Sequence, residues 1–260
     1  MKDYLYLHTR DLPYFRALLR AVESRFYQDL DLPSPTLDLG CGDGHFAQLT
    51  FDRKLEAGVD PRTGPVREAR ARGVYGEVIE ADGANMPYPD AYFSSALSNS
   101  ALEHIPHLDG VLAETARVLK PGAPFVFSVP NQNFLPSLSF ARFLDAIGLK
   151  PLAAAYRAFF NTISRHETCE NPEQWTKRLE AAGFKVERYW HYFSPAALAA
   201  FEWGHYLGLP SLVIHFLTGK WRLTGSRWKV APITALIRKY YEEPVPQENG
   251  GYTFYVTRRV

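Results

Sequence analysis

Three glycines at alternate positions, Gly40, Gly42 and Gly44, follow a short apolar segment that begins at Thr36. A strand that runs into such a turn and opens a helix lets a ligand lie against bare backbone. The spacing differs from the G-x-G-x-x-G pattern that binds the pyrophosphate of a dinucleotide. The turn therefore predicts a nucleotide-binding site that differs from a dinucleotide site.

Acidic residues follow two further apolar segments. Asp60 ends the segment 57–60, 22 residues after Asp38, and Asp82 with Gly83 follows the segment 78–81. A carboxylate at the end of a second strand can accept hydrogen bonds from both hydroxyls of a ribose, although an acid there can also simply cap a helix. Asp82 could accept from the amino group of an adenine or belong only to an Asp-Gly turn. Together with the glycines, these acids favour an adenosine site.

The elements that must position these residues alternate along the chain. We expect strands at 36–39, 57–60, 78–81, 91–97, 124–129, 184–193 and 252–257, and helices at 44–50, 66–72, 110–119 and 172–182. This alternation predicts an α/β fold with a doubly wound, mostly parallel sheet, whose strands end at one ligand-binding edge. We predict one domain over 1–260, with helical cap insertions at about 134–163 and 194–243 and an N-terminal lid or helix at about 1–30.

Composition excludes several classes of protein. The chain is 46% hydrophobic and 22% charged with a formal net charge of +1, which gives no reason to expect nucleic acid as a partner. No stretch approaches the roughly 20 apolar residues of a membrane span, and the N-terminus has no apolar signal core. The two cysteines, Cys41 and Cys169, have neither a disulfide nor a metal-site spacing. We therefore expect a cytoplasmic protein without a metal site.

The segment 37–46, with its acidic-x-Gly-x-Gly-x-Gly order, resembles motif I of the class I S-adenosylmethionine (SAM)-dependent methyltransferases. Segments 58–60, 80–83, 86–93, 102–105 and 117–122 resemble later stretches of the small-molecule type, which includes the ubiquinone and menaquinone biosynthesis enzymes. The resemblance implies a Rossmann-like seven-stranded sheet with an antiparallel last strand. It also implies SAM as the cofactor, S-adenosyl-L-homocysteine as the product and a small-molecule acceptor.

Two departures from the family pattern narrow the reaction. Many relatives carry Phe-Asp at the start of the fourth strand, whereas this chain has Phe93-Ser94. The run Ser98-Asn99-Ser100 lacks the Asn-Pro-Pro-Tyr signature of methyltransferases that act on amino groups of nucleobases and glutamine. Methylation of oxygen or carbon is therefore favoured over that type of N-methylation.

The resemblance also assigns the cofactor contacts. The glycine turn would lie under the methionine part of SAM, with Asp38 near its ammonium group and Asn99 near its carboxylate or the reacting face. Asp60 would hold the ribose, and Asp82 with Gly83 the adenine. Cys41 is a small filler with no redox or nucleophilic role. The assigned residues are Asp38, Gly40, Cys41, Gly42, Asp43, Gly44, Asp60, Pro61, Asp82, Gly83 and Asn99.

A hydroxyl acceptor needs a general base, whereas carbon and amine acceptors have different needs. The candidates are His8, His104, His107, His166, His191 and His205. His166 comes first, because in related enzymes its loop folds over the substrate cavity; the alternative is an exposed loop histidine. His104, beside Glu103, comes second, with a packing role as its alternative. His8 could close the cavity from the N-terminus.

The two insertions are apolar and aromatic, which indicates either a hydrophobic cap core or a bulky apolar or aromatic acceptor. Between Trp203 and Tyr241 the chain has six basic residues and no acid, so 218–241 either meets a membrane surface weakly or forms a solvated basic face. A SAM-dependent methyltransferase is the leading hypothesis. The alternatives are a non-catalytic SAM-binding regulatory protein and, less favoured by the glycine spacing, an NAD-dependent oxidoreductase.

Overall fold

The computed structural model describes residues 2–218, 221 and 226–260. They form two compact units, each made of three chain segments. The sheet unit contains residues 30–132, 165–190 and 252–260, and the helical unit contains residues 1–29, 133–164 and 191–251. Residues 219, 220 and 222–225, which include Lys220 and Arg222 of the predicted membrane-contact segment 218–241, lie outside the described residues.

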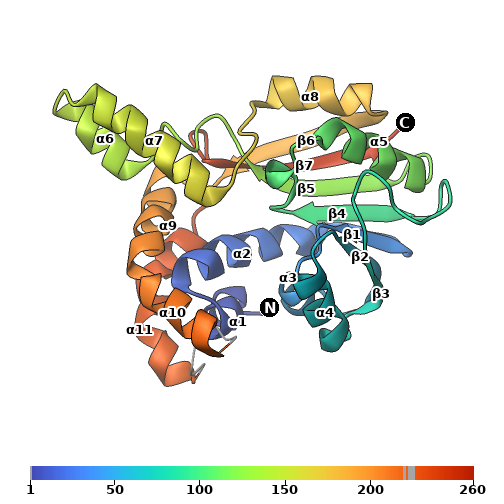
Figure 1. The fold of residues 1–260 in the computed structure, drawn as a ribbon, viewed down its shortest axis with the longest axis horizontal. Coiled ribbons are helices and arrows are strands. Elements are labelled where there is room, and N and C mark those ends of the chain that lie inside the picture. The colour runs from blue at the N-terminus through green and yellow to red at the C-terminus, as the bar shows by residue number, and fades with distance from the viewer. Residues whose placement is uncertain (1, 219–220, 222–225) are drawn as a thin grey trace. The chain divides into compact units, whose positions relative to one another are not determined.

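A seven-stranded sheet forms the core of the sheet unit (Figure 1), with the order β3-β2-β1-β4-β5-β7-β6. Strands β1 to β5 pair in parallel, and β7 pairs antiparallel to β5. The predicted Rossmann-like sheet with an antiparallel last strand is therefore confirmed. The strands are β1 (Thr36–Leu39), β2 (Leu55–Asp60), β3 (Tyr75–Glu80), β4 (Ser95–Asn99), β5 (Pro124–Pro130), β6 (Phe184–Tyr192) and β7 (Tyr252–Arg259).

The predicted start of the fourth strand at residue 91 is wrong. Ala91 has a positive φ of 52°, which a strand residue does not adopt, and Phe93 makes only an isolated bridge to Leu119. The ladder begins at Ser95, where pairing with β1 starts. The third strand begins at Tyr75 rather than at residue 78 because Tyr75 pairs with Leu55 of β2.

The helices of the sheet unit follow the predicted alternation and bury apolar faces against the strands. Leu112 of α5 and Trp175 of α8 lie in one buried cluster with Phe127 of β5 and Tyr255 of β7. An Asn171–Gln174 capping box fixes the start of α8. These elements are α3 (His45–Thr50), α4 (Thr63–Arg72), the 3₁₀ turn η2 (Leu102–His104), α5 (Leu108–Val118) and α8 (Pro172–Ala181).

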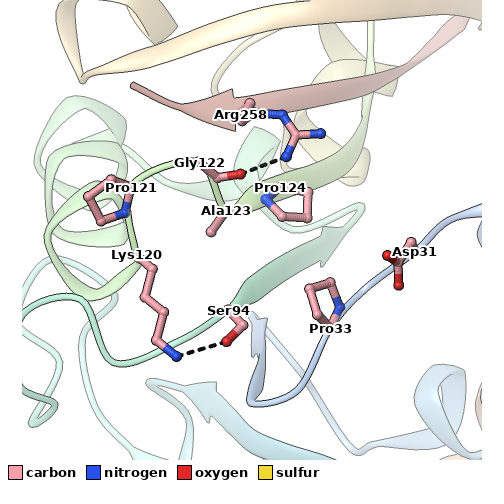
Figure 2. Close-up of a pocket in the computed structure, with 9 residues that line it drawn as sticks. All are labelled: Asp31, Pro33, Ser94, Lys120, Pro121, Gly122, Ala123, Pro124 and Arg258. Carbon is pink, nitrogen blue, oxygen red and sulfur yellow. Dashed lines mark hydrogen bonds between the residues drawn. The ribbon is translucent and has the colours of Figure 1, made fainter.

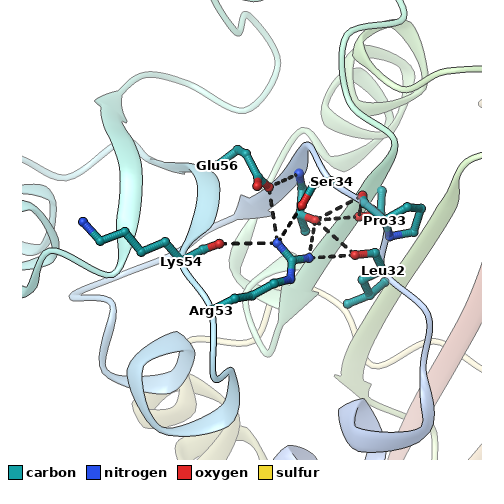
Figure 3. A network of polar contacts seen from close by, with 8 residues as sticks. Leu32, Pro33, Ser34, Arg53, Lys54 and Glu56 are labelled. Atoms are coloured by element: carbon teal, nitrogen blue, oxygen red, sulfur yellow. Dashed lines mark hydrogen bonds and ion pairs between the residues drawn. The ribbon is translucent and has the colours of Figure 1, made fainter.

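A polar network fixes the amino ends of β1 and β2 (Figure 3). The Arg53 guanidinium donates to the carbonyl oxygen of Leu32 at 2.7 Å and to the Thr36 hydroxyl at 2.8 Å. Glu56 accepts a hydrogen bond from the Thr36 N–H at 2.6 Å. The carboxyl ends of these strands, where the predicted site residues lie, are at the opposite edge of the sheet.

The helical unit contains both predicted insertions and the N-terminal helices. Inside it, the buried Glu23 of α2 accepts a hydrogen bond from the Tyr192 hydroxyl at 2.8 Å. None of the described helices is long and apolar enough to cross a membrane. Its helices are α1 (Tyr4–Asp11), α2 (Tyr14–Phe26), η1 (Tyr27–Asp29), α6 (Ser139–Ala146), α7 (Lys150–Ser164), α9 (Pro195–Leu207), α10 (Leu209–Thr218) and α11 (Arg227–Tyr241).

Candidate active site

The glycine turn lies at the carboxyl end of β1, between β2 and β4. Gly40, Gly42 and Gly44 have φ values of 73°, 55° and 74°, a region that only glycine adopts at little cost. A Cβ atom on Gly40 would lie 2.5 Å from the Cβ of Ala101, so the turn packs tightly against the segment after β4. The strand order reverses direction here, which is where open α/β sheets bind ligands.

Asp60 ends β2 as a buried carboxylate that faces this turn. It accepts a hydrogen bond from the Gly42 N–H at 3.1 Å and one from the Arg62 N–H at 3.0 Å. The Arg62 guanidinium adds a bidentate contact at 3.0 and 3.2 Å. These four donors fill the acceptor positions of the carboxylate. A ribose diol that binds Asp60 must therefore replace the guanidinium, whose side chain is 64% exposed.

Asp38 and Cys41 lie beneath the turn. The Tyr75 hydroxyl donates to Asp38 at 2.6 Å, and burial together with the Asp38 charge raises the pKa of Tyr75 well above its usual value. Burial, followed by the charges of Asp38 and Asp60, raises the pKa of the Cys41 thiol. The thiol packs against Gly58, where an added Cβ would lie 3.0 Å from Sγ. Cys41 is therefore a neutral packing residue in this structure.

Asp43 connects the turn to α4. It accepts from the His45 N–H at 3.1 Å and from the Arg72 guanidinium at 2.9 Å, and Arg72 also donates to the Asp43 carbonyl oxygen. Burial acts to raise the pKa of Asp43, but the Arg72 charge and the His45 N–H outweigh it, so the pKa is lowered. The ionised carboxylate therefore helps to hold the turn in place.

Replacing Arg72 by Ala should reduce the free energy of unfolding by up to about 1 kcal/mol at neutral pH, because the pair is partly exposed. The folded-state pKa of Asp43 is below its unfolded value of about 3.9. Its stabilisation is therefore fully present above that value and is lost as pH falls through the folded-state pKa. Urea unfolding from about pH 7 to about pH 3 should show the difference between parent and variant shrinking.

Lys177→Ala provides the control, because the Lys177–Glu173 pair on α8 is fully on the surface. It should change stability little at any pH. A difference between the parent chain and Arg72→Ala that stays constant down to the lowest pH would contradict the assigned role of Asp43.

The remaining predicted cofactor residues lie on the loops after β2 and β3 and at the last position of β4. Pro61 is exposed and directly follows β2. Asp82 is exposed and accepts a hydrogen bond from the Ala84 N–H at 2.9 Å. Gly83 is buried. A side chain there would crowd the core, since an added Cβ would lie 3.1 Å from the Leu39 side chain. The buried Asn99 accepts from the Ser128 hydroxyl at 3.2 Å, which fixes the orientation of its amide.

His104 follows the Gly40–Ala101 contact by three residues and lies beside the buried Glu103. Its Nδ1 atom is 2.8 Å from the carbonyl oxygen of Arg165. A carbonyl oxygen only accepts, so this contact requires the proton on Nδ1 and leaves Nε2 as the basic nitrogen of the neutral ring. Nε2 lies 3.8 Å from the Glu103 carboxylate, which would stabilise the ring after it takes up a proton.

The loop that carries His166 is fixed against η2. The N–H of Glu167 donates to the Glu103 carbonyl oxygen at 2.7 Å, and Arg165 has a positive φ of 56° that accompanies its contact with His104. The rings of His104 and His166 lie 5.6 Å apart between centroids. The structure therefore brings together the two histidines that the sequence proposed separately.

Cys169 completes this cluster. Its Sγ atom lies 3.7 Å from Nδ1 of His166. Burial and, to a lesser degree, the Glu103 charge raise the pKa of the Cys169 thiol to about 12. The thiol is therefore protonated at neutral pH and contacts His166 as a neutral group.

Other candidate histidines have structural roles in the helical unit. His8 is completely buried, and its Nε2 lies 3.0 Å from the Ser24 hydroxyl. His205 packs among aromatic rings, with the Phe15 ring centroid 4.4 Å away, and burial lowers its pKa. Burial also lowers the pKa of His191. His107, in the sheet unit, is exposed and precedes α5.

Several residues that pair with the predicted ones carry no signal in the sequence. Arg62 could have been suspected, since it follows Asp60 by two residues. Tyr75 bonds to Asp38, 37 residues away, and Arg72 bonds to Asp43, 29 residues away. Ala101 contacts Gly40 because β1 and β4 are neighbours in the sheet. No local pattern marks such contacts.

A cavity of about 300 Å³ lies at the other edge of the sheet (Figure 2). Asp31 and Pro33 before β1, Ser94 before β4 and Arg258 near the end of β7 contribute to its lining. Lys120 donates to the Ser94 hydroxyl at 3.0 Å across it. Because these residues lie at the amino ends of the parallel strands, the cavity is separate from the glycine turn and Asp60.

Comparison with known proteins agrees with this geometry. Residues 37–127 match the family model described as "Methyltransferase domain". A "Probable S-adenosylmethionine-dependent methyltransferase" from Mycolicibacterium smegmatis is 30% identical over 170 residues, which are 65% of this chain and 59% of the relative. Trans-aconitate 2-methyltransferase from Methylobacterium nodulans is 33% identical over 164 residues, which are 61% of this chain and 60% of the relative. The chain thus spans about three fifths of the length of these relatives.

A solved structure from Thermotoga maritima, described as a SAM-dependent methyltransferase and possible histamine N-methyltransferase, shares the fold. Its TM-score is 0.55 at 16% identity, over 94% of this chain and 90% of that one. The fold is therefore that of the class I SAM-dependent methyltransferases, as the sequence motifs predicted. Residues 37–127, which match the methyltransferase-domain model, contain the glycine turn, Asp60 and His104.

Proposed function

We propose that this chain transfers a methyl group from SAM to oxygen or carbon of a small apolar or aromatic acceptor, with His104 as the general base. The observation that carries the proposal is the position of His104. Its Nδ1 is fixed by the Arg165 carbonyl oxygen, and its Nε2 faces the buried Glu103. The histidine follows directly on the segment that packs against the glycine turn.

The residues at the carboxyl ends of β1 to β4 fit SAM. Asp60 offers a buried carboxylate to a ribose diol, and an added Cβ on Gly42 would meet no atom within 4 Å, so the turn is open on that side. Asp82 and Gly83 would hold the adenine, while Asp38, Asn99 and the turn residues would hold the methionine part. When bound, SAM supplies an activated methyl group, so the protein has mainly to align the acceptor.

His104 would remove the proton of the acceptor during transfer. A phenol, with a pKa near about 10, gains from such a base at neutral pH. The buried Glu103 would stabilise the positive charge that develops on the ring, and the Arg165 carbonyl oxygen would keep the ring in one orientation. His166 would support this arrangement from 5.6 Å away.

Two further points support the acceptor class. The insertions at 134–163 and 194–243 are rich in apolar and aromatic residues. The Methylobacterium nodulans relative is named for trans-aconitate, a small molecule. The relative favours a small acceptor. The composition of the insertions favours an apolar or aromatic one.

Calorimetry with SAM, S-adenosyl-L-homocysteine and NAD tests the cofactor. We expect binding of the first two and none of NAD; binding of NAD alone would replace the proposal by an oxidoreductase. A screen with labelled SAM against phenols, quinol precursors, fatty acids and glycan hydroxyls then tests the reaction. SAM binding without transfer to any of these classes would favour a non-catalytic regulatory protein.

Asp60→Asn should weaken SAM binding by about 10- to 100-fold, because an amide oxygen replaces a charged acceptor for two ribose hydroxyls. Arg62→Ala makes a sharp comparison, since it removes the guanidinium that competes for the same carboxylate. We expect Arg62→Ala to bind SAM at least as tightly as the parent chain. Equal losses in both variants would show that Asp60 acts by holding Arg62 rather than the ribose.

A further inference from the structure

The hairpin formed by α6 and α7 ends in an apolar tip. Phe143, Ile147, Leu149 and Leu152 are each 42–56% exposed there. Loop tips are usually polar, and a contiguous exposed apolar patch marks an interaction surface.

The tip has a defined backbone. Gly148 has a positive φ of 82°, and its N–H donates to the carbonyl oxygen of Asp145 at 3.0 Å. The N–H of Leu149 donates to the carbonyl oxygen of Leu144 at 2.9 Å. This pair of bonds is a Schellman motif, which ends α6 and turns the chain into α7. Ile147 and Leu149 are therefore presented on an ordered turn.

A buried carboxylate from α9 fixes the base of the hairpin. Glu202 accepts hydrogen bonds from the N–H groups of Ser139 and Phe140, at 2.6 and 3.1 Å, and from the Tyr156 hydroxyl of α7 at 2.7 Å. It holds the first turn of α6 and the middle of α7 at once. The hairpin is therefore anchored at one end and exposes apolar side chains at the other.

The charge of the hairpin is positive. Residues 139–164 contain Arg142, Lys150 and Arg157 but only one acid, Asp145. Arg157 bonds to Asp145 at 2.5 Å, whereas Arg142 and Lys150 are exposed beside the apolar tip. Two copies of the tip that met face to face would oppose these positive charges, but an anionic lipid surface would complement them.

We propose that the α6–α7 tip inserts into the surface of a membrane that contains anionic lipid. The helices have 8 and 15 residues, fewer than the roughly 20 that cross a bilayer, so the hairpin enters the interface without spanning it. Apolar side chains at the tip enter the acyl boundary, while Arg142 and Lys150 contact the headgroups. This binding is independent of the proposed reaction.

Co-sedimentation with vesicles of phosphatidylcholine, alone or mixed with phosphatidylserine, tests the proposal. We expect the parent chain to sediment with the mixed vesicles. The double variant Ile147→Asn/Leu149→Asn should lose at least about tenfold in partitioning, since two apolar anchors become polar. The variant Arg142→Gln/Lys150→Gln should lose roughly 30-fold on the mixed vesicles, in proportion to the two charges removed.

Leu236→Asn on α11 is the matched control, because Leu236 is 64% exposed and lies within the predicted segment 218–241. It should bind vesicles as the parent chain does. The proposal fails if the parent chain stays in the supernatant at low salt, if the tip variants still sediment, or if only the α11 variant is impaired. Light scattering supplies a further outcome: a parent dimer that the tip variants break would make the tip an interface between two copies.

Discussion

A His104→Gln variant is expected to lose about 10²- to 10⁴-fold in turnover, the range that general bases contribute, while its affinity for SAM stays unchanged. Glutamine is a neutral side chain of similar length that cannot take up a proton at neutral pH. The measurements are kcat with the acceptor found in the screen and Kd for SAM by calorimetry. A loss in kcat without a loss in Kd assigns His104 to the proton transfer rather than to the cofactor.

The pH profile separates a base from a positioning residue. In the parent chain, protonation of His104 should reduce turnover at acidic pH, and His104→Gln should remove this dependence. His166→Ala should also lower turnover sharply but keep the acidic dependence, because His104 remains. His107→Gln, an exposed neighbour before α5, should behave as the parent chain. Unchanged turnover in His104→Gln would remove His104 from the mechanism.

Gly40→Ala is the second substitution with a large expected effect. The alanine would have to adopt a φ of 73°, which costs about 1–2 kcal/mol, and its Cβ would lie 2.5 Å from that of Ala101. Overpacking of a tight contact costs about 1–3 kcal/mol more. We expect the free energy of unfolding to fall by roughly 2–5 kcal/mol and SAM binding to weaken more than about tenfold, because the turn must move.

Gly73→Ala separates backbone strain from displacement of the turn. Gly73 has a similar φ of 67°, but an added Cβ would meet no atom within 4 Å. It should cost about 1–2 kcal/mol of stability and leave SAM affinity unchanged. If Gly40→Ala and Gly73→Ala bind SAM equally well, the contact with Ala101 is not what positions the turn.

Local patterns predicted much of the sheet because most strands carry their own apolar run, and the first three end at or close to a glycine or an acid. β1 has the predicted limits, and Asp60 ends β2 as expected. The start of β4 was missed because residues 91–94 are as apolar as a strand, while Ala91 turns the chain away through its positive φ. Hydrophobicity alone does not reveal such a backbone reversal.

The candidate site was predictable only one residue at a time. The family motifs pointed to His104, and the loop before α8 pointed to His166, but their proximity depends on hydrogen bonds between residues more than 60 positions apart. The ion pair between Arg62 and Asp60 likewise depends on the conformation of a flexible side chain in the folded protein. Partners of this kind come from tertiary structure and leave no spacing in the sequence.

The place of β7 in the sheet has a consequence for biosynthesis. β7 is made after β5 and β6, yet it lies between them, and six of its eight residues are buried. Until residues 252–259 leave the ribosome, β5 and β6 lack the neighbour that satisfies their facing backbone groups. Unpaired strand edges attract other chains. The edge of β5 thus stays unpaired while residues 131–251 are made, and that of β6 while residues 193–251 are made, so both are open to aggregation during that interval.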